Sequence, residues 1–458
     1  MSDYHFIGIG GIGMGKLASL LLSKGKSVSG SDVAESAMVQ SLRSQGATVM
    51  IGHDPGNVQG ARHVIYSSAI KSENPEMVAA RQAGCLIFKR AQLLAELMNE
   101  YETITVAGAH GKTTTTSMIA HMLIQAGLDP TTAIGGVFQG GSHQEKLGNG
   151  KYFVAELDES DGSFLYFFPK ISVITNIDFE HVDFYGDWDR ILDAYAQFIG
   201  QTQDHGLLVG CIEDKRLERL LKASGKRFVG YGFSSHEISA RAIQVKKGGV
   251  SFECFKRGRS LGQVVLNRPG QHNVLNALAC IAVGLELELP FAVIKESLAG
   301  FKGVRRRFEL RGSWKDIVLY DDYAHHPTEI AATLKTAKSF SARRVVAVFQ
   351  PHRYTRTKFL WKEFTMAFKD ADELFVTDIY AASEEVIDGV NAKKLCDEIV
   401  LKSGKKATYL PKEMIAGRIV SVACEGDLVI TLGAGDITKI CGDILNQLNE
   451  RAVVLHES

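Results

Sequence analysis

Short apolar runs alternate with helical stretches along the chain, and glycine-rich turns separate them. In the first part, the apolar spacing of 15–24 predicts a helix, and apolar runs predict strands at 4–8, 26–30, 47–51 and 63–67. A strand, a glycine turn and a helix in series are typical of a parallel α/β sheet. We therefore expect residues 1–98 to form a Rossmann-like domain.

A second series begins after a polar stretch, 99–102, that has the character of a linker. Its pattern predicts helices at 113–126 and 270–285 and strands at 103–107, 152–156 and 171–176. Residues 230–265 alternate apolar and polar side chains and contain glycine, which favours an antiparallel insertion. We expect residues 99–303 to form a central domain with the parallel sheet of a P-loop ATPase and this insertion.

A third series starts near Gly303, with helical stretches between strands predicted at 317–320, 344–349, 373–377 and 428–432. Residues 304–458 are expected to form a second Rossmann-like domain. The predicted fold class is therefore α/β, with three domains.

The composition is that of an ordinary globular protein, and it excludes several classes of function. Lys and Arg number 52, as do Asp and Glu, so the chain lacks the basic character of a nucleic-acid-binding protein. Its seven cysteines form no Cys-x-x-Cys pair, which argues against a disulfide framework or a zinc site and favours a reducing, cytoplasmic location. The apolar start leads directly into a glycine loop, so we expect no secretory leader. The chain contains no run of about 18 apolar residues, so we expect no membrane insertion.

The first glycine loop, Gly8-Ile9-Gly10-Gly11-Ile12-Gly13, joins the first predicted strand to the first helix. Its G-x-G-x-x-G pattern lets backbone N–H groups and the helix N-terminus approach a diphosphate. Asp32 follows near the end of the second strand, where a carboxylate can accept a hydrogen bond from a ribose hydroxyl. These residues alone indicate NAD binding, and the alternative is a tight strand–helix turn without a ligand.

The second glycine loop, Gly108-Ala109-His110-Gly111-Lys112-Thr113-Thr114, also joins a strand to a helix. Its lysine can meet the β- and γ-phosphates of a nucleotide, and the Thr113 hydroxyl can serve Mg²⁺. Val106 stands where a complete G-x-x-x-x-G-K-[ST] motif has its first glycine. The alternative is an ordinary helix start with a solvent-exposed lysine, although the threonines at 113–116 are poor helix formers. Two such loops predict two phosphorylated ligands.

Acidic residues and a histidine follow two strands of the central domain. Glu156 comes directly after an apolar run, in the same domain as the second loop, and is a candidate ligand of Mg²⁺. Asp158, Glu159 and Asp161 fit a solvated acidic turn, which is also the alternative for Glu156. His181 is a candidate to bind a second metal ion or to steady the triphosphate. The alternative is that His181 has a structural role.

Two further groups suggest ligand contacts. Asn273 and Asn276 lie three residues apart at a helix start and share a face, where their amides can pair with adenine or, alternatively, cap the helix. The segments 305–309, 320–327 and 349–356 supply arginines and histidines, and the last two segments follow strands, so they should meet at one sheet edge. This set suits an anionic substrate; a random surface cluster is the alternative.

Seven motifs in chain order resemble those of the Mur ligase family of peptidoglycan synthesis: AGAHGKTTT, VAELDESD, TNIDFEH, HNVLNA, RRFE, DDYAHHP and FQPHRYTRT. The resemblance covers nearly the whole chain and is far more specific than one glycine loop. HFIGIGGIGM, YSSAI and FQPHRYTRT look most like the member that adds L-alanine. The resemblance therefore implies an ATP-dependent ligase that joins L-alanine to the carboxylate of UDP-N-acetylmuramate through an acyl phosphate. The first loop then meets a UDP-sugar and not NAD.

The resemblance also implies roles for individual residues. Catalytic roles would belong to Lys112, Glu156, His181, Arg307, His325, Arg353 and Arg356. ATP would contact Gly108, Ala109, His110, Gly111, Lys112, Thr113, Thr114, Asn273, Asn276, Arg307 and Asp322. Mg²⁺, or alternatively Mn²⁺, would be held by Thr113, Glu156 and His181. The UDP-sugar would contact Gly8, Gly10, Gly11, Gly13, Asp32, Ser67 and Ser68. The amino-acid side would be lined by Tyr323, His325, His352, Arg353 and Arg356.

Two positions depart from the family pattern: Ala109 replaces the threonine of GTHGKT, and Ala324 replaces the glycine of YGHHP. Neither removes a required donor, so only fine positioning is affected. A ligase that recycles whole tripeptides shares much of the pattern, but it does not typically carry FQPHRYTRT. A dehydrogenase leaves Lys112 and Glu156 unexplained, and a non-catalytic nucleotide-sensing homologue should have lost such residues. The sequence leaves open L-alanine against glycine or L-serine, monomer against homodimer, and the base that takes the amine proton.

Overall fold

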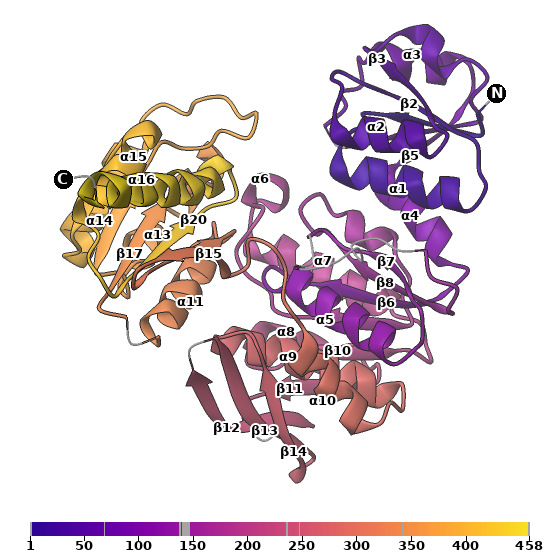
Figure 1. The fold of residues 1–458 in the computed structure, drawn as a ribbon. Coiled ribbons are helices and arrows are strands. Elements are labelled where there is room, and N and C mark those ends of the chain that lie inside the picture. Colours follow the sequence, from indigo (N-terminus) through magenta and orange to yellow (C-terminus); the bar gives the residue numbers. More distant parts are fainter. Residues whose placement is uncertain are drawn as a thin grey trace.

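The computed structural model has three α/β domains, each built around one sheet (Figure 1). It describes residues 2–456 except 68, 137, 138, 140–146, 235, 236, 247 and 341. The N-terminal domain is indigo in Figure 1, the central domain is purple to pink, and the C-terminal domain is orange to yellow. The predicted α/β fold with three domains is confirmed, whereas the boundaries at 98/99 and 303/304 stay predictions.

The N-terminal sheet is parallel, with strand order β3-β2-β1-β4-β5. Its strands are β1 (Tyr4–Ile7), β2 (Val28–Asp32), β3 (Thr48–Ile51), β4 (His63–Tyr66) and β5 (Leu86–Lys89). Its helices are α1 (Ile12–Ser23), η1 (Pro55–Val58), α2 (Ala37–Ser44), α3 (Pro75–Gln82) and α4 (Arg90–Met98). Apolar side chains such as Phe6 and Leu94 belong to a core that continues into the central domain through Phe153 and Phe198. The first glycine loop is thereby carried on a domain that packs against the central one.

The central sheet has the order β14-β13-β12-β11-β10-β9-β6-β8-β7. Its strands are β6 (Glu102–Ala107), β7 (Thr131–Ala133), β8 (Tyr152–Glu156), β9 (Ile171–Ile174), β10 (Leu207–Cys211), β11 (Phe228–Gly232), β12 (Ile238–Lys246), β13 (Gly249–Lys256) and β14 (Arg259–Leu266). Pairing is parallel up to β12 and antiparallel from β12 to β14. The predicted insertion is confirmed, but it begins at Ile238 and not at Gly230, because β11 still pairs in parallel with β10.

Helices cover the central sheet and bury a second large apolar core. They are α5 (Lys112–Gln125), η2 (Ser163–Tyr166), α6 (Val182–Tyr185), α7 (Trp188–Gln201), α8 (Lys215–Ala223), α9 (Gln271–Glu286) and α10 (Phe291–Gly300). Helix α5 follows the second glycine loop and packs against α9, which carries the two predicted asparagines.

The C-terminal sheet has the order β15-β16-β20-β17-β18-β19, and only its β15–β16 pair is antiparallel. Its strands are β15 (Glu309–Trp314), β16 (Ile317–Asp322), β17 (Arg344–Phe349), β18 (Glu373–Val376), β19 (Ala407–Tyr409) and β20 (Asp427–Leu432). Its helices are α11 (Pro327–Lys338), α12 (Tyr354–Phe359), α13 (Trp361–Met366), α14 (Ala392–Ser403), α15 (Lys412–Val422), η3 (Asp436–Thr438) and α16 (Lys439–His456). Separate apolar clusters cover its two faces.

Parallel strands bring chemically active segments to the same sheet edges, because their carboxyl ends point the same way. In the central domain, β6, β8 and β9 end at the second glycine loop, at Glu156 and at the segment leading to His181. In the C-terminal domain, β16 and β17 end at the segments of His325 and Arg356. All seven cysteines are free thiols. Among the described helices, none combines the length and apolar character that crossing a bilayer requires.

Candidate active site

The second glycine loop is held tightly against the end of β9. Gly108 has φ +127°, and a Cβ added there would lie 2.2 Å from Thr175 Oγ1, so the position accepts glycine only. Gly111 has φ +81° and precedes the first residue of α5. The loop backbone is therefore fixed in place before any phosphate binds.

Lys112 reaches across the loop to an acidic partner. Its Nζ donates to Glu159 Oε1 at 2.8 Å and to the carbonyl oxygens of Gly108 and Ala109 at 2.6 and 3.1 Å. Burial alone would lower the pKa of Lys112, but the charge of Glu159 and further carboxylates raises it above its ordinary value. Lys112 is thus a charged group next to a cavity, as a phosphate-binding lysine must be.

Glu159 corrects the sequence interpretation. We expected it in a solvated acidic turn, but it is 3% exposed. The chain folds back after β8, and the Tyr185 hydroxyl donates to the Glu159 carbonyl oxygen at 2.5 Å, so the turn is packed beneath α6. A buried carboxylate needs a partner, which Lys112 supplies.

Thr113 and Glu156 form a second contact between loop and strand end. The Thr113 hydroxyl donates to Glu156 Oε1 at 2.7 Å, and the Gly135 N–H donates to Glu156 Oε2 at 2.8 Å. The predicted proximity of these two residues is observed.

His181 lies in a different group from Thr113 and Glu156. Its Nε2 is 3.6 Å from Glu159 Oε1 and 3.7 Å from Glu180 Oε2. Glu159 Oε2 and Glu180 Oε1 are buried without a hydrogen-bond partner, and atoms of the three residues lie within 4.8 Å of one another. Two carboxylates and an imidazole are ligand types that fit a divalent cation.

Glu180 also links the central domain to the C-terminal domain. Its Oε1 lies 3.2 Å from Arg356 Nη2 and 3.7 Å from His325 Nε2. Burial alone would raise the pKa of Glu180, but Arg356, His181 and His325 lower it to about 2. Sequence analysis missed this residue, although it directly precedes His181 at the same strand end.

Arg307, Tyr323 and His325 face the cavity from the C-terminal domain. The Arg307 guanidinium lies 5.1 Å from the centre of the Tyr323 ring and 3.7 Å from Glu329 Oε1. His325 Nδ1 lies 2.9 Å from the Tyr323 carbonyl oxygen. Burial lowers the pKa of His325 to about 4, so its ring is neutral near pH 7.

The large cavity is not lined by His352, Arg353 or Arg356. The His352 ring stacks on Tyr380 at 5.5 Å, and Arg356 Nη1 is 3.2 Å from His352 Nδ1. Arg353 lies 3.9 Å from Asp183 and, with Arg356, borders a small separate cavity of about 20 Å³. Of the predicted amino-acid-side residues, Tyr323 and His325 are therefore the ones that line the large cavity.

Asn273, Asn276 and Asp322 are buried. The two asparagines share a face as predicted, because Asn276 Nδ2 donates to Asn273 Oδ1 at 3.2 Å. Thr115 of α5 donates to Asn276 Oδ1 at 3.1 Å, so this pair supports the helix that begins at Lys112. Asp322 accepts the N–H groups of Phe308 and of Ala324, each at 2.7 Å, and burial raises its pKa to about 6. Their contacts with ATP stay predictions.

In the first glycine loop, Gly8 has φ +80° and the Gly10 N–H donates to Asp32 Oδ2 at 2.8 Å. One Asp32 oxygen is therefore used to fasten the loop. Gly13 lines the large cavity and so do Lys16 and Arg90, which sequence analysis did not select. Ser67 is half-buried after β4, and Ser68 lies outside the described residues.

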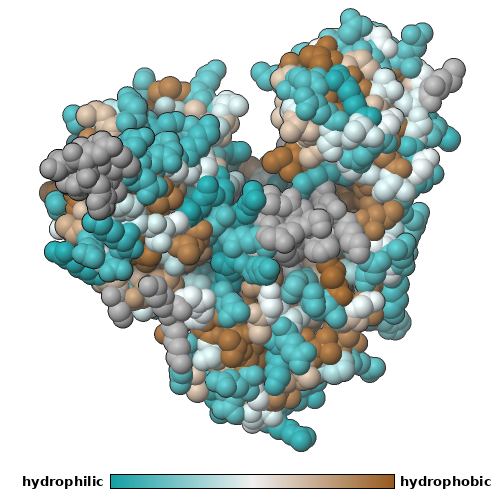
Figure 2. Space-filling model, viewed as in Figure 1, coloured by the Kyte–Doolittle hydropathy of each residue, from teal (hydrophilic) through white to brown (hydrophobic). Residues whose placement is uncertain are grey.

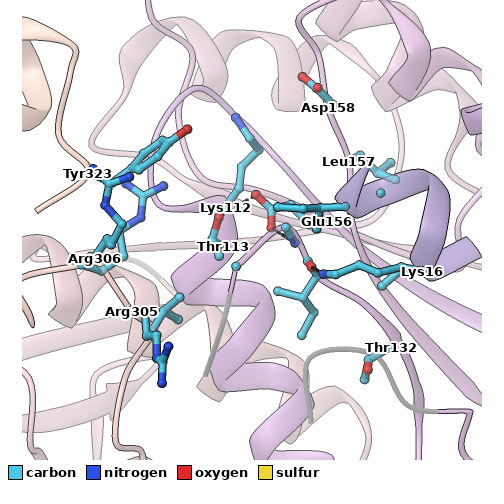
Figure 3. Close-up of a pocket in the computed structure, with 18 of the residues that line it drawn as sticks. Lys16, Lys112, Thr113, Thr132, Glu156, Leu157, Asp158, Arg305, Arg306 and Tyr323 are labelled. Atoms are coloured by element: carbon cyan, nitrogen blue, oxygen red, sulfur yellow. Dashed lines mark hydrogen bonds between the residues drawn. The ribbon is translucent and has the colours of Figure 1, made fainter. Parts of the chain in front are cut away.

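One cavity of about 1180 Å³ joins these elements. Its walls come from α1, from the second glycine loop and the end of β8, and from the C-terminal domain at residues 305–307. Figure 2 shows a deep hollow between the N-terminal domain, at upper right, and the C-terminal domain, at left. In Figure 3, Lys112, Thr113 and Glu156 occupy the centre, with Arg306 and Tyr323 on one side and Lys16 on the other.

Three Mur ligase domain models match successive parts of the chain: the catalytic domain at 3–102, the middle domain at 106–284 and the glutamate ligase domain at 306–435. UDP-N-acetylmuramate–L-alanine ligase of Trichlorobacter lovleyi is 47% identical over 438 residues, which cover 94% of this chain and 96% of that protein. The enzyme of the same name from Desulfosudis oleivorans is 47% identical over 456 residues, covering 97% and 99%.

Two solved structures show the same arrangement of domains. UDP-N-acetylmuramate-alanine ligase from Thermotoga maritima has a TM-score of 0.81 and 32% identity, and the match covers 98% of this chain and 100% of that one. A murein peptide ligase from Psychrobacter arcticus has a TM-score of 0.70 and 26% identity, with 98% and 99% coverage.

Proposed function

This chain belongs to the Mur ligase family, and we propose that it joins L-alanine to the carboxylate of UDP-N-acetylmuramate at the expense of ATP. The observation that carries the proposal is one shared cavity. It is lined by the helix of the first glycine loop, by the second glycine loop (108–114, the ATP loop from here on) and by Arg307. A UDP-sugar and ATP can meet there. The high identity to enzymes of that name supports the choice of substrates.

In the proposed reaction, a carboxylate oxygen of UDP-N-acetylmuramate attacks the γ-phosphorus of ATP, and ADP leaves. The L-alanine amine then attacks the acyl carbon, phosphate leaves, and the amine loses a proton. Lys112 and Arg307, which both line the cavity, would offset the charge on the transferred phosphoryl group. His325, whose neutral ring faces the cavity, can accept the amine proton at Nε2.

A divalent cation is part of the proposed site. We assign Thr113 and Glu156 to one position and Glu159, Glu180 and His181 to a second. We propose Mg²⁺, with Mn²⁺ as the alternative, because oxygen ligands predominate. When bound, such an ion neutralises phosphate charge. A cytoplasmic location and a monomeric or homodimeric state stay predictions.

The test is phosphate release from ATP by the purified protein with UDP-N-acetylmuramate and one amine at a time. We expect release with L-alanine and less with glycine or L-serine, which differ from L-alanine by one small group. Release with the tripeptide L-alanyl-γ-D-glutamyl-meso-diaminopimelate and none with L-alanine would instead assign the recycling activity.

A further inference from the structure

His110 stands in the ATP loop, but its side chain is directed away from the large cavity. Neighbouring loop residues line that cavity, whereas His110 is not among its lining residues in the described part of the chain. Its main chain is held by the end of β9: Asn176 Oδ1 accepts the His110 N–H at 2.9 Å, and Thr175 Oγ1 donates to its carbonyl oxygen at 2.6 Å. The imidazole is therefore available for a task other than binding phosphate.

The ring lies between two carboxylates from different domains. His110 Nε2 is 2.8 Å from Asp178 Oδ2 in the central domain, and Nδ1 is 3.3 Å from Glu329 Oε1 in α11 of the C-terminal domain. Burial alone would lower the pKa of His110, but these two partners raise it to about 10. The ring is thus charged near neutral pH, and each nitrogen faces an acid.

The C-terminal domain adds two more contacts to the same group. The Thr328 hydroxyl donates to Asp178 Oδ2 at 2.7 Å, and the His326 ring lies 4.8 Å from the His110 ring. His326 and Glu329 also form a capping box at the start of α11, which fixes the direction of the Glu329 side chain. The start of α11 therefore contacts the ATP loop directly.

A metal ion is the rival occupant, since atoms of His110, Asp178 and His326 lie within 4.8 Å of one another. Asp178 Oδ2 already accepts from the Thr328 hydroxyl and pairs with His110 Nε2. The oxygen that a cation would use is therefore already occupied by two hydrogen-bonding partners, although His110 Nδ1 and His326 Nε2 are buried without a hydrogen bond.

We infer that His110 is a positioning residue that fastens the ATP loop to the C-terminal domain through Asp178, Thr328 and Glu329, so that ATP binding and closure of the C-terminal domain favour each other. The inference rests on the proposed function, in which ATP occupies the loop. By linkage, a contact that stabilises the arrangement in which the C-terminal domain touches the ATP loop lowers the apparent dissociation constant of a nucleotide that binds this arrangement more tightly.

Thr328 provides the sharpest test, because it is exposed and does not border the large cavity. Thr328→Val keeps the side-chain shape and removes the donor to Asp178, and Thr328→Ser is the matched control that keeps it. Closure is followed by small-angle X-ray scattering during titration with the non-hydrolysable analogue AMP-PNP and Mg²⁺. We expect Thr328→Val to need about threefold to tenfold more AMP-PNP for half-maximal compaction, and Thr328→Ser to match the wild type.

Steady-state kinetics supply the second readout. We expect Thr328→Val to raise KM for ATP by a similar factor while kcat at saturating ATP changes less than about twofold, a split that general loss of structure would not produce. Adding Thr328→Val to Asp178→Ala should have no further effect, because the hydroxyl acts through that carboxylate.

Unchanged AMP-PNP dependence and unchanged KM in Thr328→Val would overturn the inference, as would equal effects of Thr328→Val in the wild-type and Asp178→Ala backgrounds. If Thr328→Val lowers the melting temperature, the Thr328→Ala and Thr328→Ser pair repeats the comparison. The scattering experiment uses no amino acid. Failure of L-alanine ligation would therefore count against the proposed function and leave this test standing.

Discussion

At the scale of single residues, the site depends on which acids are buried. Glu159 and Glu180 are both nearly inaccessible, and both lie beside His181. Lys112 is charged because Glu159 outweighs the effect of burial on its pKa. Lys112 pairs with Glu159, which is distant in the sequence, and Glu180 pairs with Arg356 of another domain.

Replacing Lys112 with Ala should reduce ligation on the order of 10³-fold, because about 4 kcal/mol of transition-state stabilisation is lost. Product formation from ATP, UDP-N-acetylmuramate and L-alanine is the measurement. Lys215→Ala is the control, since Lys215 lies in an exposed helical pair with Glu218, and it should leave the rate unchanged. Full activity of Lys112→Ala would contradict the assigned site.

The buried carboxylate of Glu76 should make the stability of the N-terminal domain depend on pH. Burial alone would raise its pKa, but His5, the Ser31 hydroxyl and Asn57 lower it to about 2. A lowered carboxylate pKa contributes stability above the unfolded value of about 4.5 and loses it as the pH falls towards about 2. Glu76→Gln should therefore lower the urea midpoint at pH 7, and the difference from the wild type should shrink below about pH 4.5.

The control for this experiment is Glu96→Gln, because Glu96 is exposed on α4 of the same domain. Glu96→Gln should change the urea midpoint little, both at pH 7 and below about pH 4.5. A difference between Glu76→Gln and wild type that stays constant down to pH 3 would show that the Glu76 charge is not responsible.

At the scale of elements, the turns between strands and helices determine where the chemistry lies. The ATP loop packs against the residues that follow β9. Asn276 of α9 accepts a hydrogen bond from Thr115 and so supports α5. The first loop is fastened by Asp32 in a similar way. The close approach of Thr175 and Asn176 to Gly108 leaves no room for a larger residue in the ATP loop.

Gly108→Ala should destabilise the protein by about 1–3 kcal/mol and abolish ATP-dependent ligation, because the new Cβ meets Thr175 and the backbone of Asn176. Thermal unfolding and activity are both measured. Gly200→Ala is the matched control, since Gly200 lies in α7 with nothing within 4 Å of an added Cβ. It should stabilise α7 by about 0.5–1 kcal/mol and keep activity. Normal activity of Gly108→Ala would mean that the loop can move aside.

At the scale of the whole molecule, three domains enclose the cavity in which we propose that the reaction takes place. The C-terminal domain contacts the ATP loop through α11, and the N-terminal domain contacts the central one through α1 and α4. Lys16 of α1 donates to the Ile134 carbonyl oxygen at 3.1 Å, next to Gly135, whose N–H holds Glu156. The N-terminal domain is thereby connected to Glu156, the proposed metal ligand.

Replacing Lys16 with Met should loosen this connection and raise KM for UDP-N-acetylmuramate by about threefold to tenfold, with a smaller effect on KM for ATP. Methionine keeps the length of the apolar stem. Steady-state kinetics with each substrate varied in turn are the measurement. Equal changes in both KM values would indicate general distortion of the cavity.

The sequence by itself determined the α/β class, the two glycine loops, the antiparallel insertion and the family, because these depend on local periodicity and on short ordered motifs. It also located Thr113 in the helix start after β6, Glu156 at the end of β8 and His181 in the segment that follows β9. Only the tertiary structure decided that His181 groups with Glu159 and Glu180, that Glu329 reaches the ATP loop, and that His110 faces the domain interface. The physical reason is that burial and charge pairing join residues far apart in the chain, and no local pattern records which acid will meet which base.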